Sequence, residues 1–310
     1  MSAAVSDAVS RFAPHRDRLF GVAYRMTGSV ADAEDCVQES FVRWQRTDVA
    51  HISNDEAYLV RVVTRLAIDR QRAAARRRET YVGPWLPEPL VRPIGATRSD
   101  DPADLAAVAD SLSFAFLVML DELSAAERAA FILHDVFGFA FDDIAATLDR
   151  DVVACRQLAS RARRKLRSSS DAPDGAGASA GHGPAGDATT ITTLLGCLAS
   201  GDIDGCLALL APGVVLVSDA GANRYAARRH VVGADRVSRL LLNLFAREGP
   251  RISDIEAVDV NGSFGITMAH PEGPLVITAD VDDAGAVTQV WIQMNPDKLT
   301  RLSSGLAADR

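Results

Sequence analysis

"FDDIAATLDRDVVACRQLASRARRKLR", Phe141 to Arg167, is the stretch that decides the fold of the helical part of the chain. Its pattern predicts a short helix from Phe141 to Leu148, a turn from Asp149 to Asp151, and then a basic helix, which is the order of a helix-turn-helix. The inward face of the second helix carries Cys155, Leu158, Ala159, Ala162 and Leu166. The outward face, able to hydrogen-bond base edges or phosphates, carries Arg156, Gln157, Ser160, Arg161 and Arg164.

Basic residues gather in two runs although the net charge of the 310 residues is −8. One run lies within 61–78 and the other within 150–167, and acid is scarce in both. Two separate basic helices on an acidic protein predict two contacts with a polyanion.

The N-terminal block is predicted to be a small helical bundle. Ser29 and Asp32 have the spacing of a capping box, and the helix after them would bury Ala33, Val37, Phe41 and Trp44. Its other side carries an acidic stripe of Asp32, Asp35 and Glu39. The next helix would bury Leu59, Val62, Val63 and Leu66 and expose Arg61, Arg65, Arg72 and Arg76.

Two linkers divide the chain. "YVGPWLPEPL", Tyr81 to Leu90, cannot be helix interior or central strand because proline lacks an amide donor, yet it is apolar enough to dock on a surface. Residues from Ser168 to Gly186 are small or polar and predict a flexible tether. The predicted segments are 8–80, 81–104 (linker), 105–168, 169–186 (linker), 187–300 and 301–310.

The segments 105–168 and 187–300 differ in their predicted secondary structure. Leu105, Val108, Leu112 and Met119 predict a further amphipathic helix before the capping box of Ser124 and Glu127. Past the second linker, two helices are expected near 188–199 and 202–210, another near 233–247, and strands elsewhere. Helices followed by a mostly antiparallel sheet predict an α+β domain.

Composition excludes several classes. Apolar residues make up 48% and charged residues 24%, without an apolar run long enough for a membrane span. "MSAAVSDAVS" has no basic segment before an apolar one, so we expect a cytoplasmic protein without a membrane partner. Cys36, Cys155, Cys197 and Cys206 stand singly, which predicts reduced thiols, no metal site and no cofactor.

These motifs together resemble a known family. "VADAEDCVQESFVRW" (30–44), the arginine helix and "LSAAERAAFIL" followed by the helix-turn-helix resemble domains two and four of extracytoplasmic-function (ECF) sigma factors of the sigma-70 family, over roughly residues 10–167. "GPWLPEP" (83–89) and "NPDKL" (295–299) resemble a subgroup with a C-terminal SnoaL-like, cone-shaped domain. That subgroup carries "DGGGK" where this chain has "DAGAN" (219–223), and Asp149 stands where the helix-turn-helix usually has glycine.

The resemblance implies a sigma factor that directs promoter recognition and transcription initiation, with the SnoaL-like domain as a fused regulatory module. It implies polymerase-core binding by Asp32, Asp35, Gln38, Glu39 and Phe41. It implies that Arg61, Arg65, Arg72 and Arg76 hold the −10 element, and that the second helix of the helix-turn-helix reads the −35 element. The expected partners are RNA polymerase core enzyme and promoter DNA.

An intramolecular contact is the hypothesis for regulation: the C-terminal domain would dock on the sigma domains or on the stiff linker. Its residues would be Trp85, Leu86, Pro87, Asp219, Asn295, Pro296, Asp297, Lys298 and Leu299.

Two other functions remain open at this stage. One is a ligand-responsive helix-turn-helix regulator, which would have no use for the polymerase-binding motif. The other is an active SnoaL-like isomerase or hydrolase, with acid–base candidates Asp219, His230, His270, Asp280 and Trp291. We expect no catalytic residues, because sequence brings no two of these together.

Overall fold

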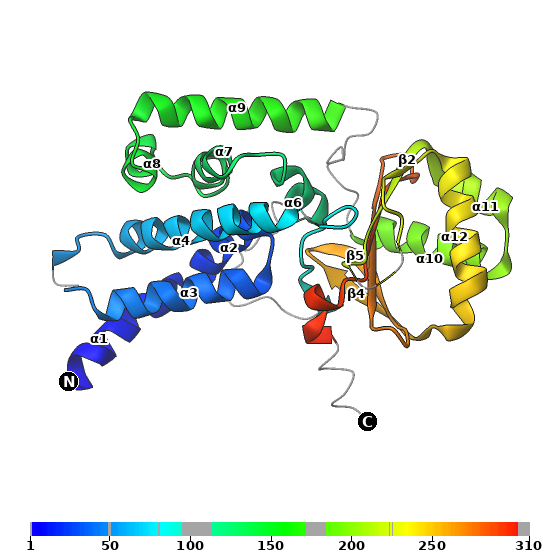
Figure 1. The fold of residues 1–310 in the computed structure, drawn as a ribbon, viewed down its shortest axis with the longest axis horizontal. Coiled ribbons are helices and arrows are strands. Elements are labelled where there is room, and N and C mark those ends of the chain that lie inside the picture. Colours follow the sequence, from blue (N-terminus) through cyan, green and yellow to red (C-terminus); the bar gives the residue numbers. More distant parts are fainter. Residues whose placement is uncertain are drawn as a thin grey trace. The chain divides into compact units, whose positions relative to one another are not determined.

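The computed structural model of the 310-residue chain describes residues 2–48, 51–79, 81–94, 113–171, 184–222, 224 and 226–302. The chain forms two compact units (Figure 1). The helical unit comprises Met1–Glu79 and Met119–Arg167, and the C-terminal unit comprises Thr80–Val118 and Ser168–Arg310. Residues 81–94 therefore belong to the same unit as the domain that follows them by a hundred residues.

The first part of the helical unit is a bundle of α1 (Ser2–Phe12), η1 (Ala13–His15), α2 (Arg16–Thr27), α3 (Val30–Gln45) and α4 (Asp55–Arg78). Leu19, Met26, Trp44 and Leu59 are fully buried in it. Ser29 caps α3 by accepting from the amide of Asp32, as the sequence predicts.

The second part is α7 (Ala125–Phe131), the π-helical turn η3 (Ile132–Val136), α8 (Phe141–Leu148) and α9 (Val152–Asp171). Between the two parts, α6 (Phe114–Leu120) begins in the C-terminal unit and ends in the helical unit. The capping box of Ser124 and Glu127 is present, and the helix-turn-helix is confirmed. Asp149 adopts φ 53° and ψ 54°, the left-handed conformation that its short polar side chain tolerates at a helix end.

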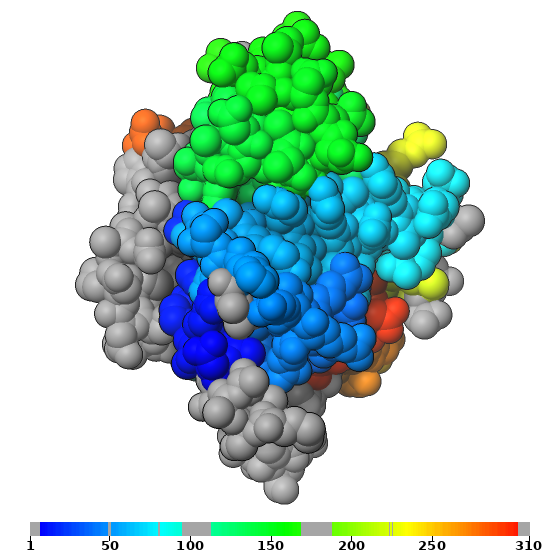
Figure 2. All heavy atoms as spheres, turned by 90° about the vertical axis from the view of Figure 1, so that its left-hand side faces the viewer, coloured from blue at the N-terminus to red at the C-terminus, as the bar shows by residue number. Residues whose placement is uncertain are grey.

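Within the helical unit, α8 packs on α4 and α7 packs on α2 and α4. The space-filling view shows the helices α7–α9 (green) seated on α4 (light blue) as one continuous surface (Figure 2).

The C-terminal unit holds a seven-stranded sheet in the order β1-β4-β5-β6-β7-β2-β3. The strands are β1 (Val91–Pro93), β2 (Leu210–Asp219), β3 (Val231–Val232), β4 (Ser253–Val260), β5 (Ser263–Ala269), β6 (Leu275–Val281) and β7 (Val287–Gln293). All neighbours pair antiparallel except β2 and β7. The helices are α10 (Pro184–Ser200), α11 (Ile203–Leu209) and α12 (Ala234–Glu248), with short turns η4 (Gly249–Arg251) and η5 (Pro296–Lys298). The predicted α+β class is confirmed.

Side chains alternate along a strand, so the sheet has two faces. Other segments cover both faces and bury them. On the face we call the helix face, Leu216, Ile266 and Ile292 pack with α10–α12. On the other, which we call the linker face, the strands supply Val215, Val217 and Trp291, and Leu86, Phe114 and Leu299 cover them.

The linkers differ in detail from the sequence prediction. Val91–Pro93 pairs with β4 as an edge strand, the place where a sheet accepts proline. α9 continues to Asp171 and α10 begins at Pro184, so both helices enter the segment predicted to be a tether. The predicted helix around Leu105, Val108 and Leu112 lies outside the described residues. Among the helices that are described, none is both long and apolar enough to cross a membrane.

Candidate functional site

The acidic face of α3 is partly paired with α4. One guanidinium nitrogen of Arg70 lies 3.3 Å from Asp32 and 2.9 Å from Asp35. Asp35 and Gln38 remain exposed at the surface, while Glu39 bonds Arg43 at 3.0 Å on the same helix. Phe41 is half-buried and packs edge-on against Phe12, with ring centroids 4.9 Å apart. The face accessible to a partner is therefore centred on Asp35 and Gln38.

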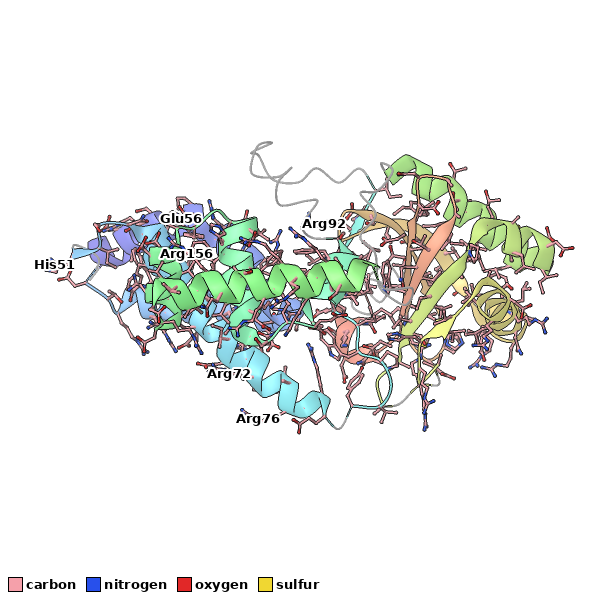
Figure 3. All side chains as sticks on the ribbon, turned by 90° about the horizontal axis from the view of Figure 1, so that it is seen from above. His51, Glu56, Arg72, Arg76, Arg92 and Arg156 are labelled. Carbon is pink, nitrogen blue, oxygen red and sulfur yellow. The ribbon has the colours of Figure 1, made fainter. Side chains whose placement is uncertain are left out.

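The four arginines of α4 that are predicted to bind DNA differ in their surroundings. Arg72 and Arg76 are exposed and project from the C-terminal half of α4 (Figure 3). Arg65 instead donates to the main-chain oxygens of Ala146 and Thr147, each at 2.9 Å. These carbonyls are at the C-terminal end of α8, where a helix leaves acceptors unsatisfied and favours a cation. Arg61 is half-buried and lines a small hollow between α4 and α8.

The outward face of α9 is accessible as predicted. Arg156, Gln157, Ser160, Arg161 and Arg164 are all exposed, whereas Cys155, Leu158, Ala159 and Ala162 are buried. Arg163 and Lys165 bind Asp135 and Glu127, at 2.7 and 2.8 Å, and so hold α9 onto η3 and α7. Two of the outward arginines also contact the rest of the unit, because Arg161 lies 3.9 Å from Glu127 and the guanidinium of Arg156 lies over the Phe141 ring.

Two buried arginines, which the sequence gave no reason to expect, join the parts of the helical unit. Arg128 donates to the main-chain oxygens of Leu120 and Met26, both at 2.8 Å, and binds Asp121 at 2.7 Å. Burial lowers the pKa of Arg128, and Asp121 opposes that change. Arg25 donates to Gly21 and lies over the ring of Phe137.

Asp219 is the centre of the linker face. Its side chain is fully buried at the end of β2. It accepts hydrogen bonds from the Tyr81 hydroxyl, from the Leu86 amide at 2.9 Å and from the Gly221 amide at 3.1 Å. A buried carboxylate needs such donors, because burial without them is strongly unfavourable. Burial raises the pKa of Tyr81, and the bond to Asp219 adds to the rise.

Lys298 supplies the matching charge. Its ammonium lies 2.6 Å from Asp219 and 2.5 Å from the main-chain oxygen of Leu86. It also lies over the Trp85 ring, 4.0 Å from the centroid, and near the ring of Tyr81. One side chain near the C-terminal end therefore touches the sheet and three residues of the linker.

The remaining linker residues are held by amide side chains. Asn295 donates to the Tyr81 hydroxyl at 2.8 Å and caps η5 through the amide of Asp297. Gln293 donates to the main-chain oxygen of Pro87 at 3.1 Å. Asn261 and Leu90 exchange two bonds, at 2.9 and 3.0 Å. Leu86, Pro87 and Leu299 are buried, Trp85 and Pro296 are half-buried, and Asp297 is exposed.

The acid–base candidates do not form one site. Asp219 and Trp291 face the linker, where Phe114 packs edge-on against the Trp291 ring at 5.8 Å. His270 lies on the helix face, with Nε2 3.3 Å from Glu248. His230 is exposed and Asp280 lies on β6. Among the described residues, no cluster of His, Cys, Asp and Glu side chains has the geometry to hold a metal ion.

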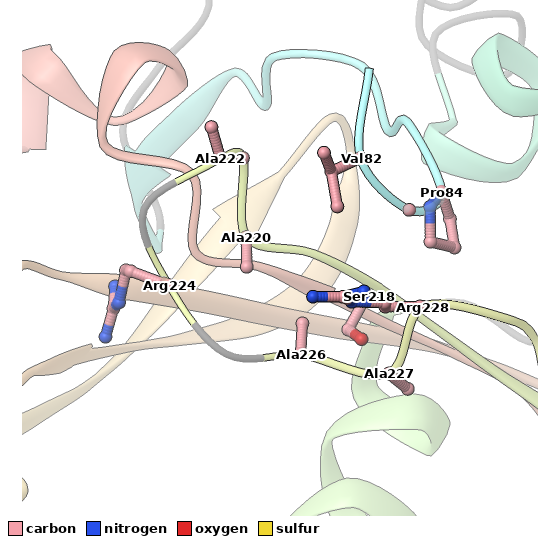
Figure 4. A pocket seen from close by; sticks show the side chains of 11 residues that line it. Val82, Pro84, Ser218, Ala220, Ala222, Arg224, Ala226, Ala227 and Arg228 are labelled. Carbon is pink, nitrogen blue, oxygen red and sulfur yellow. The ribbon is translucent and has the colours of Figure 1, made fainter. Parts of the chain in front are cut away.

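The described residues of the C-terminal unit surround cavities on both faces of the sheet. One, of about 230 Å³, is bounded by Val82 and Pro84 of the linker and by residues 218, 220–222, 224 and 226–228 (Figure 4). The other, of about 180 Å³, lies on the helix face and is mostly apolar.

Sequence reasoning missed Tyr81, Asn261, Gln293 and Arg70. Tyr81 opens the apolar linker and Gln293 lies two positions before the "NPDKL" motif, so closeness to a motif is the signal that marks them. Nothing in the sequence marks Asn261, and the basic run of 61–78 contains Arg70 without showing that it pairs with Asp32 and Asp35 of α3.

Comparisons with known proteins agree on one family. Residues 12–77 match the family described as Sigma-70 region 2, and residues 113–166 match Sigma-70, region 4. The chain is 39% identical to the ECF RNA polymerase sigma factor SigJ of Mycobacterium tuberculosis, over 94% of this chain and 93% of that protein. It is 32% identical to the probable ECF RNA polymerase sigma factor SigI of the same species, over 94% of each. The crystal structure of SigJ superposes with a TM-score of 0.73 and 37% identity, covering 94% of this chain and 98% of that one.

Proposed function

Because the chain belongs to the ECF sigma factors of the sigma-70 family, we propose that its helical unit binds core RNA polymerase through α3 and promoter DNA through α4 and α9, under control of its C-terminal domain. The observation that carries the regulatory part is the buried Asp219, to which the linker and Lys298 both bind. The linker connects the two parts of the helical unit, so whatever holds it influences both.

Polymerase binding is assigned to the exposed part of α3. Asp35 and Gln38 are accessible, and the family motif supports their role. Changing both to Ala should weaken assembly with core polymerase while circular dichroism keeps its helical signal. Asp69→Ala, at an exposed position of α4, is the matched control. Unaltered core affinity of the double variant would remove α3 from the interface.

DNA reading is divided between α9 and α4. If an arginine of α9 reads a guanine, changing it to Ala should weaken binding to promoter DNA by about 1–3 kcal/mol at that base. A phosphate contact should instead weaken binding on every sequence and reduce the salt dependence. Two nitrogens of Arg65 are engaged in capping α8, and we infer from this that the helical unit in this structure is a closed form of the reader.

Docking of the linker supports a mechanism for keeping this form closed. Residues 81–94 and Phe114 are both held on the sheet, which removes part of the tether between α4 and α7. A shortened tether restricts how far α4 and α8 can separate. Release of the linker would restore that length and free Arg65 for promoter DNA. The C-terminal domain would thus act in place of a separate anti-sigma protein.

Run-off transcription with purified core polymerase tests this proposal. The full chain is compared with a chain lacking 295–310, with a chain ending at Arg167, and with Lys298→Met, which keeps an apolar stem over Trp85 but removes the charge. Both the short deletion and Lys298→Met should raise transcription. Arg239→Met, which removes one exposed charge from α12, should leave transcription unchanged. Equal transcription by all four chains would reject regulation by docking.

The chemical reactivity of Lys298 reports on docking of the linker. The chain has only two lysines, Lys165 and Lys298. Acetylation by an amine reagent, read by mass spectrometry, should be slower at Lys298 than at Lys165, because the Lys298 side chain is 13% exposed and the Lys165 side chain 46%. Trp85→Ala should speed labelling of Lys298 and leave Lys165 unchanged. Equal rates at Lys298 with and without the Trp85 ring would contradict the docked arrangement.

A further inference from the structure

The helix-face cavity is lined by apolar side chains from two helices and from the sheet. Leu198 of α10, Leu241 and Phe245 of α12, and Ile277 and Ile292 of the sheet line its volume of about 180 Å³. An apolar cavity of about 150 Å³ with a Leu, Ile and Phe lining stays dry and binds benzene. This space is therefore large enough for a single ring and offers it dispersion contacts that the empty wall lacks.

The polar groups at its mouth bind one another. Arg224 donates to the main-chain oxygen of Met294 at 3.0 Å and to those of Gly273 and Pro274 at 3.3 and 3.2 Å. Glu248 accepts from Arg247 and Arg251, at 2.8 and 2.9 Å. These groups already have partners, so a charged ligand would gain little from them and would lose its hydration.

His270 is likewise engaged at both ring nitrogens. Its Nδ1 faces two donors, the amide of Glu272 at 3.2 Å and Arg224 at 3.3 Å, and so accepts. Its Nε2 then carries the proton and donates to Glu248 at 3.3 Å. The ring closes the mouth of the cavity as part of the network, and this arrangement favours a neutral guest without strong hydrogen-bonding groups.

We propose that this cavity is a binding site for a small, neutral, ring-sized apolar molecule, and that its occupancy strengthens docking of the linker on the opposite face of the sheet. The second half rests on the regulatory function proposed above, whereas the binding site stands independently of it.

The end of β7 connects the two sites. Ile292 and Met294 line the cavity, and the residues between and after them, Gln293 and Asn295, bind the linker at Pro87 and Tyr81. The Met294 amide also donates to the main-chain oxygen of Asp219 at 2.8 Å. A guest that fixes Ile292 and Met294 therefore fixes the backbone that positions Gln293, Asn295 and Asp219.

Methionine methyl NMR of the full chain, with toluene as the probe, tests the site. The chain has five methionines, of which Met268 and Met294 line the cavity while Met26 and Met119 belong to the helical unit. Toluene should shift the Met268 and Met294 signals saturably and leave the Met26 and Met119 signals in place. Benzoate, a charged molecule of the same ring size, should shift none of them.

Two filled variants serve as controls. Leu244→Phe on α12 and Leu195→Phe on α10 each place extra carbon into the lining of the cavity. Each should abolish the toluene shift while keeping the dispersed methyl spectrum of a folded domain, and the second variant covers the case in which the first does not fold. A saturable shift that persists in a folded filled variant, or no shift in the parent chain, overturns the site.

Amide exchange tests the coupling. The Leu86 amide donates to Asp219, so its exchange reports opening of the docked linker. A ligand that binds only the docked form should slow that exchange about elevenfold at ten times its Kd. An unchanged rate at saturating toluene overturns the coupling. Because neither measurement uses transcription, failure here is distinguishable from failure of the proposed regulation, which rests on Lys298→Met in the run-off assay.

Discussion

The helix face of the C-terminal sheet is covered by α10–α12, which lie close to its strands in sequence, and the linker face is covered by segments that come from both sides of the domain. The helix face is apolar and keeps a cavity of about 180 Å³. On the linker face, a fully buried carboxylate is bound by a lysine that is 13% exposed.

The difference follows from the two kinds of interaction. Apolar burial is non-directional, so α10–α12 can stay packed on the helix face although a cavity remains between them and the sheet. A buried ion pair depends on every partner being in place, and loss of one partner leaves an uncompensated charge. The helix face thus suits permanent structure, whereas the linker face suits an attachment that is either complete or released.

Asp219→Ala should produce the largest effect, because it removes the acceptor of the Leu86 amide and the counter-charge of Lys298. We expect the free energy of unfolding of the C-terminal unit to fall by about 3–5 kcal/mol. Urea titration followed by the Met294 methyl signal measures it, and the Met26 signal of the helical unit should keep its midpoint. Asp204→Ala, at an exposed position in the first turn of α11, should cost less than about 1 kcal/mol. A comparable loss in both variants would show that the buried ion pair of Asp219 does not stabilise the C-terminal unit more than an exposed carboxylate does.

Leu86→Ala should have the next largest effect. Leu86 is fully buried against the sheet, and removing such a side chain costs about 2–5 kcal/mol. The loss should appear as faster amide exchange of residues 86–90, whereas the β5–β6 amides beside the helix-face cavity should exchange as before. Leu90→Ala, at a half-buried position of the same linker, should be milder. If Leu86→Ala sped exchange on both faces equally, the faces would be one cooperative structure.

Gly221→Ala should have a smaller effect that isolates a single contact. Gly221 has φ +66°, and a Cβ there would lie 2.8 Å from the Asn295 side chain. Gly285→Ala is the matched control, because Gly285 has φ +82° and an open space around it. Both substitutions carry the left-handed backbone cost of about 1–3 kcal/mol. The excess of Gly221→Ala over Gly285→Ala, measured by thermal unfolding, reports the contact with Asn295, and the absence of any excess would show that Asn295 is free to move.

The smallest effect concerns pH at the mouth of the helix-face cavity. The hydrogen bond from Arg247, together with those from Arg251 and His270, lowers the pKa of Glu248 below its ordinary value of 4.5, although burial opposes the change. A lowered pKa in the folded state stabilises the fold above the unfolded value, and this contribution disappears as pH falls through the folded value. Glu248→Gln should therefore flatten the loss of stability below pH 4.5, and added salt should shrink the difference. The difference in stability between the parent chain and Glu248→Gln should thus be largest near pH 7 and shrink in acid, and a difference that grows as the pH falls would contradict this sign.

The helical unit was largely predictable because its signals are local. Ser29, Ser124 and the apolar spacing of α9 specify helix ends and faces within a few residues. The same spacing could not separate Arg65 from Arg72, since the carbonyls that bind Arg65 lie 81 and 82 positions further along the chain. Periodicity says which side of a helix an arginine occupies, and a tertiary partner decides whether it is available.

The linker site was predictable in part for a different reason. Proline excluded a central strand, and the structure places Val91–Pro93 at the sheet edge. Tyr81 and Gln293 bind through hydrogen bonds to residues far away in the chain, which leave no periodic trace in sequence. The acid–base candidates Asp219 and His270 were indistinguishable in sequence, yet the sheet lies between them because they belong to opposite faces.

The separation of Leu86 from Lys298 has a consequence for biosynthesis. These contacting residues are 212 positions apart. At about 5–20 residues per second, a ribosome makes Lys298 about 10–40 seconds after Leu86. Throughout that interval the nascent chain carries α4, the linker and then the helix-turn-helix without the ammonium that completes the attachment. Until Lys298 has been made, the linker therefore lacks the ion pair that completes its attachment.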